Sequence, residues 1–441
     1  MLLSSTSTQL KVLTGKLCLI ELLAWGVLYY TFAVYLSAMQ RDLGWSSATL
    51  AGGFSVALLV SGLSAPFVGA WVDRHGSRGL IALGALVGSF GVSLWSIAFT
   101  LPTYFAGWVL IGLGMASTLY PPAFATVVRT HPEDSRKAIL TITVIGALSS
   151  TIFMPLASVL GDWLGWRGGL QVLAGAMAVV VTLLAFSLPS KAAASIVHND
   201  HKVQEDTPRA PGSFRLLVST LMIADVASVA VNVHLVLFLV DHGQSLQAAA
   251  SIAGLAGAAK IGGRLATAAG ARVSAMTLMR ASLVLTSAAL MIPLLWPSTW
   301  SAILMVIGFG ATNGARTILR PAIIVEMYGP RRFGKSNGLL QLFTTGAKSA
   351  GPLGFAVLLG AFGWSWAWPA LAVLLLASAA LLMALRPNPA KAHTDAADLV
   401  SLEAGEATSQ AGANNSTLKL ETARAGSAVT GPEDFGERTV S

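Results

Sequence analysis

The chain has 441 residues, of which 54% are hydrophobic and only 11% are charged, and its formal net charge is +8 at pH 7. Soluble domains carry about 25% charged residues, so this composition excludes an ordinary soluble protein and indicates repeated membrane crossings. The positive charge does not require a nucleic-acid partner, because cytoplasmic loops of membrane proteins accumulate Lys and Arg. The single cysteine, Cys18, excludes a disulfide framework and a cysteine-based metal site, and we expect no metal.

Long apolar runs recur along the chain, and about 20 apolar residues suffice to span roughly 30 Å of hydrocarbon. The sequence therefore predicts an all-α polytopic membrane protein with about twelve transmembrane helices. Their approximate spans are 17–39, 48–72, 80–99, 102–128, 137–161, 168–188, 214–240, 245–270, 275–295, 299–326, 334–360 and 363–385. The first run is too long for the core of a signal peptide, so we expect it to remain as a helix.

The connection between the second and third spans is a short, strongly charged turn that begins at Gly69 and includes Asp73, Arg74, Gly76 and Arg78. A helix C-terminus carries partial negative charge, which favours the two arginines there and disfavours the aspartate. We therefore expect Asp73 to cap the N-terminus of another helix.

Positive charge is distributed unequally between alternate loops. One set of loops contains thirteen Lys or Arg residues, and the opposite set contains two, Arg41 and Arg167. Because Lys and Arg accumulate on the cytoplasmic side, the first set and both termini are expected in the cytoplasm. We expect a multi-pass protein of a bacterial inner (plasma) membrane, surrounded by lipid and monomeric.

Two polar segments divide the chain. Residues 189–213 interrupt the apolar pattern and predict a cytoplasmic linker, whose clustered histidines could bind metal but fit a solvated linker better. Residues 387–441 have the composition of a disordered cytoplasmic tail. This leaves a six-helix bundle at 1–188 and a second one at 214–386.

The two halves resemble each other at a period near 199 residues. Each match is weak alone, but four matches in the same order indicate a duplicated six-helix unit. The matched segments are Asp42–Ser46 with Asp241–Ser245, Tyr120–Ala123 with Leu319–Ala322, Met154–Leu156 with Gly351–Leu353, and Gly165–Trp166 with Gly363–Trp364.

The pattern Gly-x-x-x-Asp-Arg-x-Gly-x-Arg at residues 69–78 resembles the loop 2–3 signature of the major facilitator superfamily. The resemblance implies two pseudo-symmetric six-helix bundles around a central cavity that opens alternately to either side. It also implies that Gly69 packs helix 2 against helix 11 and that Asp73 meets the start of helix 11, near Gly334–Ser336. The corresponding second-half loop, Ala268–Arg272, lacks the acid, so we expect this clamp in one half only.

Charged residues lie within the predicted spans of the second half. Such charges are costly in a bilayer and normally face the bundle interior or a wet cavity. Near the midplane or one turn toward the cytoplasm lie Asp225, Lys260, Arg264, Arg316, Arg320 and Lys348. Asp225 could neutralise Lys260 or Arg264, which would leave a surplus of positive charge. Arg264 and Arg320 could instead extend to the inner interface.

A cationic cavity of this kind is best satisfied by an anionic substrate, and arginine binds carboxylate or phosphate through two parallel hydrogen bonds. In overall pattern the chain resembles the monocarboxylate-transporter and oxalate:formate-antiporter branches of the superfamily, which use cations in helices 8 and 11. The resemblance assigns those roles to Arg264 and Lys348. We expect a small organic anion, and a carboxylate in particular, as the substrate.

Other residues within the spans complete the predicted site. Further substrate-binding candidates are Tyr29, Tyr30, Tyr120, Asn232 and His234. One of the two adjacent tyrosines is expected to face away from the cavity, since neighbours on a helix point in different directions. Glu21 or Asp225 could carry a coupling proton; ordinary packing or hydrogen bonding is the alternative for each of these residues.

The sequence contains no phosphate-binding glycine loop and no hydrolase or metalloprotease motif. We therefore expect no enzyme activity and no cofactor, and transport driven by a proton or anion gradient. The alternatives are a proton-coupled exporter of drugs or metabolites, and a transporter-like sensor that signals through its tail. Gly107–Gly114 lacks the arginine that many proton-driven drug exporters carry, which weakens the exporter interpretation.

Overall fold

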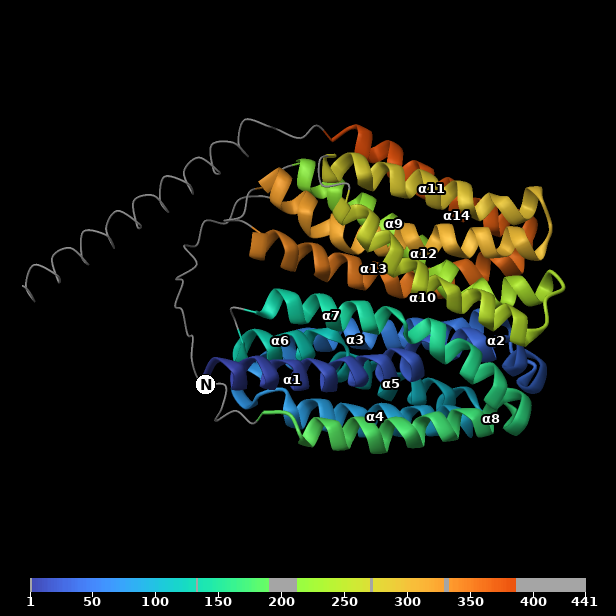
Figure 1. Ribbon diagram of the computed structural model, residues 1–441. Coiled ribbons are helices and arrows are strands. Elements are labelled where there is room, and N and C mark those ends of the chain that lie inside the picture. Colours follow the sequence, from blue (N-terminus) through green and yellow to red (C-terminus); the bar gives the residue numbers. More distant parts are fainter. Residues whose placement is uncertain (1, 132–133, 190–211, 270–272, 329–332, 386–441) are drawn as a thin grey trace, which may run out of the picture. The chain divides into compact units, whose positions relative to one another are not determined.

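The computed structural model of the protein (Figure 1) describes residues 2–131, 134–189, 212–269, 273–328 and 333–385. The linker predicted at 189–213 lies outside the described residues except at its ends. The tail predicted at 387–441 lies outside them entirely.

The described residues form α-helices, one π-helix and no strand. In chain order these elements are α1 Leu2–Trp25, η1 Gly26–Tyr30, α2 Thr31–Leu43, α3 Ser47–His75, α4 Arg78–Ser96, α5 Leu101–Thr118, α6 Tyr120–Thr130, α7 Ser135–Ala147, α8 Ser149–Phe186, α9 Gly212–Asp241, α10 Leu246–Ala269, α11 Ala275–Leu295, α12 Thr299–Tyr328, α13 Phe333–Phe362 and α14 Trp364–Met383. All the predicted spans coincide with helices, the first with α1, η1 and α2 together and the fourth with α5 and α6.

Nine stretches of the described residues are long and apolar enough to cross a membrane. One of them, Lys137–Phe186, contains two predicted spans, because Gly165, with a φ of +69°, interrupts the helical backbone of α8. The two predicted spans not among the nine are α10 and α13, helices of 24 and 30 residues. Both helices carry intramembrane cations, which lower their hydropathy.

The helices up to Ile323 and those from Gly334 onward form one compact unit. Of a second unit, which holds 324–333 and 387–441, the structure describes only the end of α12 and the first residue of α13. Within the first unit the helices run roughly parallel (Figure 1). In the first half, α4 packs against α5 and α8; in the second, α14 packs against α9 and α11. Contacts of α10 with α8 and of α2 with α9 join the two halves.

The predicted duplication is visible in matching side-chain contacts. The indole Nε1 of Trp166 donates to Asp42 Oδ2 at 3.1 Å, and that of Trp364 donates to Asp241 Oδ2 at 2.9 Å. The glycine before each tryptophan has a φ of +69°, so both helices begin from the same backbone turn. The two pseudo-symmetric halves therefore share this turn and this hydrogen bond at corresponding positions.

Glycines allow α10 and α12 to pack with their backbones in contact. A Cβ added to Gly263 would overlap the carbonyl of Ala311, and one added to Gly314 would overlap the carbonyl of Lys260. This packing holds the pair of cations at Lys260 and Arg264 of α10 beside α12, which carries the second pair.

Replacing Gly263 with Ala should lower the melting temperature of the purified protein. The new methyl group would meet the rigid backbone of Ala311, and overpacking of this kind costs about 1–3 kcal/mol. Gly262→Ala is the matched control, because an added Cβ at Gly262 has no neighbour within 4 Å. Thermal unfolding that affects both variants equally would contradict the proposed helix contact.

Candidate functional site

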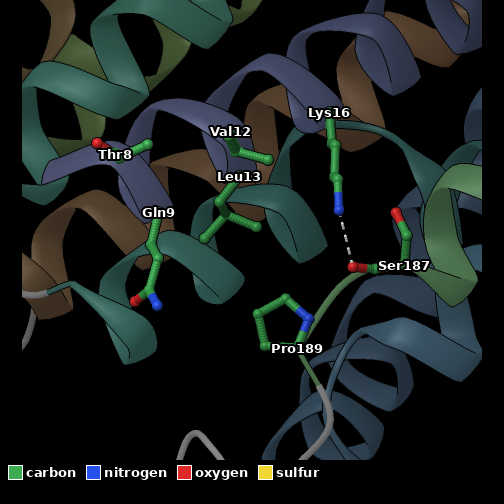
Figure 2. Close-up of a pocket in the computed structure, with 7 residues that line it drawn as sticks. All are labelled: Thr8, Gln9, Val12, Leu13, Lys16, Ser187 and Pro189. Atoms are coloured by element: carbon green, nitrogen blue, oxygen red, sulfur yellow. Dashed lines mark hydrogen bonds between the residues drawn. The ribbon is translucent and has the colours of Figure 1, made fainter. Parts of the chain in front are cut away.

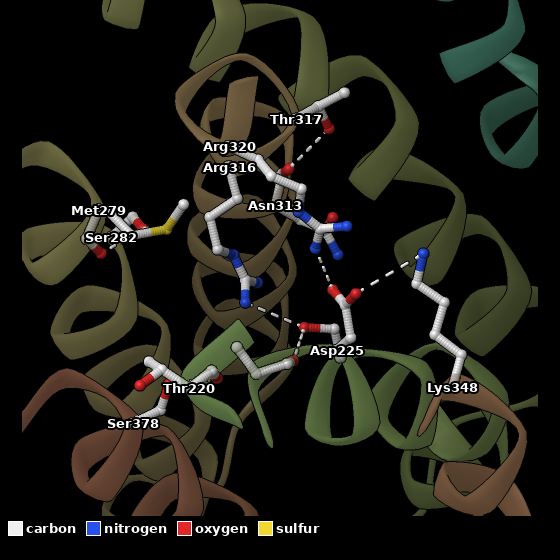
Figure 3. Close-up of polar contacts among 12 residues, drawn as sticks. Thr220, Asp225, Met279, Ser282, Asn313, Arg316, Thr317, Arg320, Lys348 and Ser378 are labelled. Atoms are coloured by element: carbon white, nitrogen blue, oxygen red, sulfur yellow. Dashed lines mark hydrogen bonds and ion pairs between the residues drawn. The ribbon is translucent and has the colours of Figure 1, made fainter. Parts of the chain in front are cut away.

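Asp225 of α9 lies at the centre of an ion-pair cluster (Figure 3). Its Oδ1 accepts a hydrogen bond of 2.6 Å from Arg320 Nη2, and its Oδ2 lies 3.6 Å from Lys348 Nζ. The sequence-based pairing of Asp225 with Lys260 or Arg264 is therefore wrong, because Asp225 points toward α12 and α13 rather than α10. Arg320 points to this acid and does not extend to the membrane interface.

Arg316, one turn before Arg320, is buried and only partly satisfied. Its Nη1 donates to Ser228 Oγ at 3.0 Å and its Nε to the Thr312 carbonyl at 3.4 Å. Its Nη2 is buried and has no hydrogen-bond partner among the described residues. An unsatisfied buried donor on a charged group is costly, so this nitrogen is available to an acceptor from a ligand.

The two cations of α10 contact the first half of the chain. Lys260 Nζ donates to the Tyr30 hydroxyl at 3.0 Å and lies 5.2 Å from the centre of its ring. Arg264 Nη1 donates to the Thr143 carbonyl at 2.6 Å. Both cations are buried, so the alternative in which Arg264 extends to the interface is also wrong. Both cations donate to neutral oxygens, so these hydrogen bonds do not neutralise their charge.

A π-helix shapes the first-half side of this contact. Residues Gly26–Tyr30 form the π-helix, Phe153 packs where a Cβ of Gly26 would lie, and Thr31 Oγ1 donates to the Gly26 carbonyl at 2.8 Å. Single π-helical turns often mark functional sites. Tyr30 contacts Lys260, and Tyr29 is within electrostatic range of Asp225. Tyr30 is thus the member of the pair that contacts a cation of α10.

Glu21 is fully buried in α1, and neither of its carboxylate oxygens has a hydrogen-bond partner in the described part of the chain. The indole of Trp25 lies close to it but outside hydrogen-bonding geometry. Tyr120 of α6 is within electrostatic range of both Glu21 and Arg264. Glu21 and Arg264 of α10 thus share one electrostatic neighbour, Tyr120.

Two candidates on α9 are held by their own helix. Asn232 Nδ2 donates to the Ser228 carbonyl at 2.8 Å. His234 Nδ1 bonds the Ala230 carbonyl at 3.1 Å, and its ring packs 4.8 Å from that of Phe355. These contacts fit the alternative of hydrogen-bonded structure for both residues.

The charged turn after α3 is bound to the end of α6. Asp73 forms an ion pair with Arg129, whose Nη1 also donates to the Val72 carbonyl at 2.6 Å. Ser77 and Thr126 share a hydrogen bond between the same elements. The sequence analysis did not assign Arg129 and Thr126 as partners of the charged turn. Their spacing of three residues, which places them on one face of a helix at the end of the fourth span, was the available signal.

The remaining residues of this turn have separate surroundings. Gly76 ends α3 with a φ of +81°, Arg78 lies 5.7 Å from the Phe186 ring, and Arg74 is exposed. The partner expected for Asp73, near Gly334–Ser336, lies where side chains are outside the described set.

A close contact between α3 and α13 lies at Gly62, where an added Cβ would be 3.0 Å from Thr345 Cγ2. At Gly69, predicted to be the packing residue, an added Cβ has no neighbour within 4 Å among the described residues.

A surface pocket lies between the start of α1 and the end of α8 (Figure 2). Its lining residues are Thr8, Gln9, Val12, Leu13, Lys16, Ser187 and Pro189. It contains none of the predicted binding residues, and its one cation, Lys16, donates to the Ser187 carbonyl at 3.1 Å. We therefore place the candidate site at the buried charges instead.

An internally duplicated, all-helical membrane bundle with buried charges is the architecture of a secondary transporter. The sequence matches the family model of the Major Facilitator Superfamily over residues 17–315 and 261–421. The chain belongs to the major facilitator superfamily and is a multi-pass membrane transporter of a small molecule.

Named relatives are consistent with this assignment. The chain is 24% identical to monocarboxylate transporter 13 of Rattus norvegicus over 326 residues, which are 72% of this chain and 74% of the relative. It is 28% identical to monocarboxylate transporter 3 of Mus musculus, over 32% of this chain and only 29% of the relative.

Solved structures share the fold. The nucleoside transporter NupG superposes with a TM-score of 0.69 at 15% identity, over 85% of this chain and 98% of its own. A bacterial homolog of the human lysosomal transporter Spinster, in an inward-facing and occupied conformation, gives 0.64 at 16% identity, over 85% and 94%.

Replacing Asp225 with Asn should destabilise the protein, because it leaves the half-buried cations Arg320 and Lys348 without their acid. Breaking a buried ion pair costs about 3–5 kcal/mol, so the melting temperature should fall clearly. The double variant Asp225→Asn, Arg320→Gln should recover part of the loss. Asp134→Asn, which removes an exposed ion pair with Lys137 at 3.9 Å, is the control and should change little. An equal change in melting temperature for Asp225→Asn and Asp134→Asn would contradict the role of the ion-pair cluster in stability.

Proposed function

We propose that this protein is a secondary active transporter of a small organic anion, and that buried cations bind its carboxylate. The observation that carries the proposal is the imbalance of intramembrane charge in the second half. Asp225 pairs with Arg320 and Lys348, but within the described residues Lys260, Arg264 and Arg316 have no ion pair. An anionic ligand would supply the missing negative charge and satisfy the free nitrogen of Arg316.

The similarity to monocarboxylate transporters supports the same class of substrate. The ion pairs also change which cation we expect to contact the substrate carboxylate. Lys348 already has an acidic partner, whereas the hydrogen bond that Lys260 makes within the described residues goes to the neutral Tyr30 hydroxyl. A carboxylate therefore gains more by approaching α10 than by displacing Asp225.

The topology, location and driving force that we propose rest on the sequence pattern. The six-helix halves are 1–188 and 214–386, joined by a cytoplasmic linker, with both termini in the cytoplasm of a bacterial cell. The protein acts as a monomer in the inner membrane, and the turn at 69–80 gates the cytoplasmic side. Transport is driven by a gradient of protons or of a second anion.

Lys260→Gln should weaken carboxylate binding roughly 10- to 100-fold, the range expected for a lost charged hydrogen bond. Binding of a panel of small monocarboxylates to purified protein, followed by calorimetry, measures the change. Lys16→Gln is the matched control, because Lys16 also donates to one neutral oxygen but lies at the pocket of Figure 2. Unchanged affinity in Lys260→Gln would contradict the assigned site.

Glu21→Gln should uncouple transport from protons, because glutamine keeps the shape of the side chain but cannot carry a proton. Uptake into proteoliposomes should no longer be accelerated by an inward proton gradient, while exchange of internal for external substrate should continue. If the proton gradient still drives uptake in this variant, Glu21 is not the coupling group and Asp225 becomes the candidate.

A further inference from the structure

We infer that the transported anion is an arylcarboxylate, whose aromatic ring stacks on Trp25, Tyr29 and Tyr120 while its carboxylate meets Lys260. This inference rests on the proposed function and narrows its substrate class. It follows from the kind of surface that the first half presents to the uncompensated cations of α10.

The carboxylate end of the proposed site contains unused donors. Lys260 Nζ carries three N–H groups, of which one donates to the Tyr30 oxygen at 3.0 Å. Because that oxygen accepts from Lys260, the Tyr30 hydroxyl proton remains free to donate. Lys260 and Tyr30 can thus bind the two oxygens of one carboxylate, with the charge of Arg264 one turn away.

Aromatic side chains surround this carboxylate end. The Trp25 ring centre lies 5.2 Å from that of Tyr29, 6.3 Å from that of Tyr30 and 5.2 Å from that of Tyr120. Phe124 stacks on Tyr120 at 5.2 Å. Five aromatic rings from η1, its flanking residue and α6 therefore form one continuous cluster.

The rings of this cluster do not fully cover one another. Trp25, Tyr29 and Tyr120 are only half-buried, in contrast to the fully buried rings of Phe54 and Trp108 nearby in the first half. Tyr30, whose ring centre lies 6.3 Å from that of Trp25 and 5.1 Å from that of Tyr29, accepts the hydrogen bond of Lys260 Nζ. The cluster therefore adjoins the cation Lys260 of α10 at Tyr30.

Ring surfaces in this arrangement favour a flat aromatic partner. Aromatic pairs in stacked or edge-to-face geometry gain more than their buried area alone provides. Trp and Tyr side chains are also stiff, so they lose little entropy when they hold a ligand. A saturated ring of equal size gains the apolar contact but not the stacking.

The test compares four probes on the full-length protein in nanodiscs: benzoate, cyclohexanecarboxylate, acetate and benzyl alcohol. Benzoate should bind roughly 5- to 10-fold more tightly than cyclohexanecarboxylate, although the latter is the more hydrophobic anion. Acetate should bind more weakly than either, and benzyl alcohol, which lacks the charge, should not bind measurably.

Two variants test the assigned rings. Trp25→Leu and Tyr120→Leu should each weaken benzoate binding more than cyclohexanecarboxylate binding, so that the ratio of the two affinities falls toward one. Trp163→Leu is the control, because Trp163 is 78% exposed, and it should preserve the preference.

Equal affinity for benzoate and cyclohexanecarboxylate in the unaltered protein would overturn this inference and leave the proposed function standing. An equal loss of both anions in the two ring variants would overturn it too, since the rings would then only support the fold. Failure of every carboxylate to bind, or binding of benzyl alcohol as tight as that of benzoate, would overturn the proposed function with it.

Discussion

Positive charge within the apolar helices α10, α12 and α13 is the constraint on which the account of this protein depends. Charges inside a membrane protein persist only when they are paired, hydrogen-bonded or functional. Asp225 compensates Arg320 and Lys348, and the other cations rely on a tyrosine hydroxyl, a serine hydroxyl and backbone carbonyls. The chain therefore holds cations in position without supplying enough acid to neutralise them, which is the condition that an anionic substrate relieves.

A symmetric scaffold carries this asymmetric chemistry. The bonds from Trp166 to Asp42 and from Trp364 to Asp241 repeat the same turn in both halves. The intramembrane cations belong to the second half, whereas the aromatic cluster, which includes Trp25, belongs to the first. A substrate that contacts the cations of one half and the aromatic rings of the other would draw the two halves together around it. Alternating access requires such a closure.

The helices and the duplication could be predicted because hydropathy and repeated turn residues are local properties of the sequence. The same is true of the cations, since a charge within an apolar run is evident without a structure. Their partners could not be predicted. Which cation meets Asp225 depends on the rotation of three separate helices, and the π-helix at Gly26–Tyr30 depends on Phe153 packing against a glycine from a distant segment. The bond of Asp73 with Arg129 was missed for the same reason.

The central claim is that the carboxylate of the substrate binds at α10, and a structure with a heavy-atom-labelled ligand tests it most directly. In an electron cryomicroscopy map of the protein with 4-iodobenzoate, the account predicts the carboxylate within hydrogen-bonding distance of Lys260 Nζ and the iodine beyond the aromatic cluster. A carboxylate bound at the pocket of Figure 2, or anywhere away from Lys260 and Arg264, would contradict it.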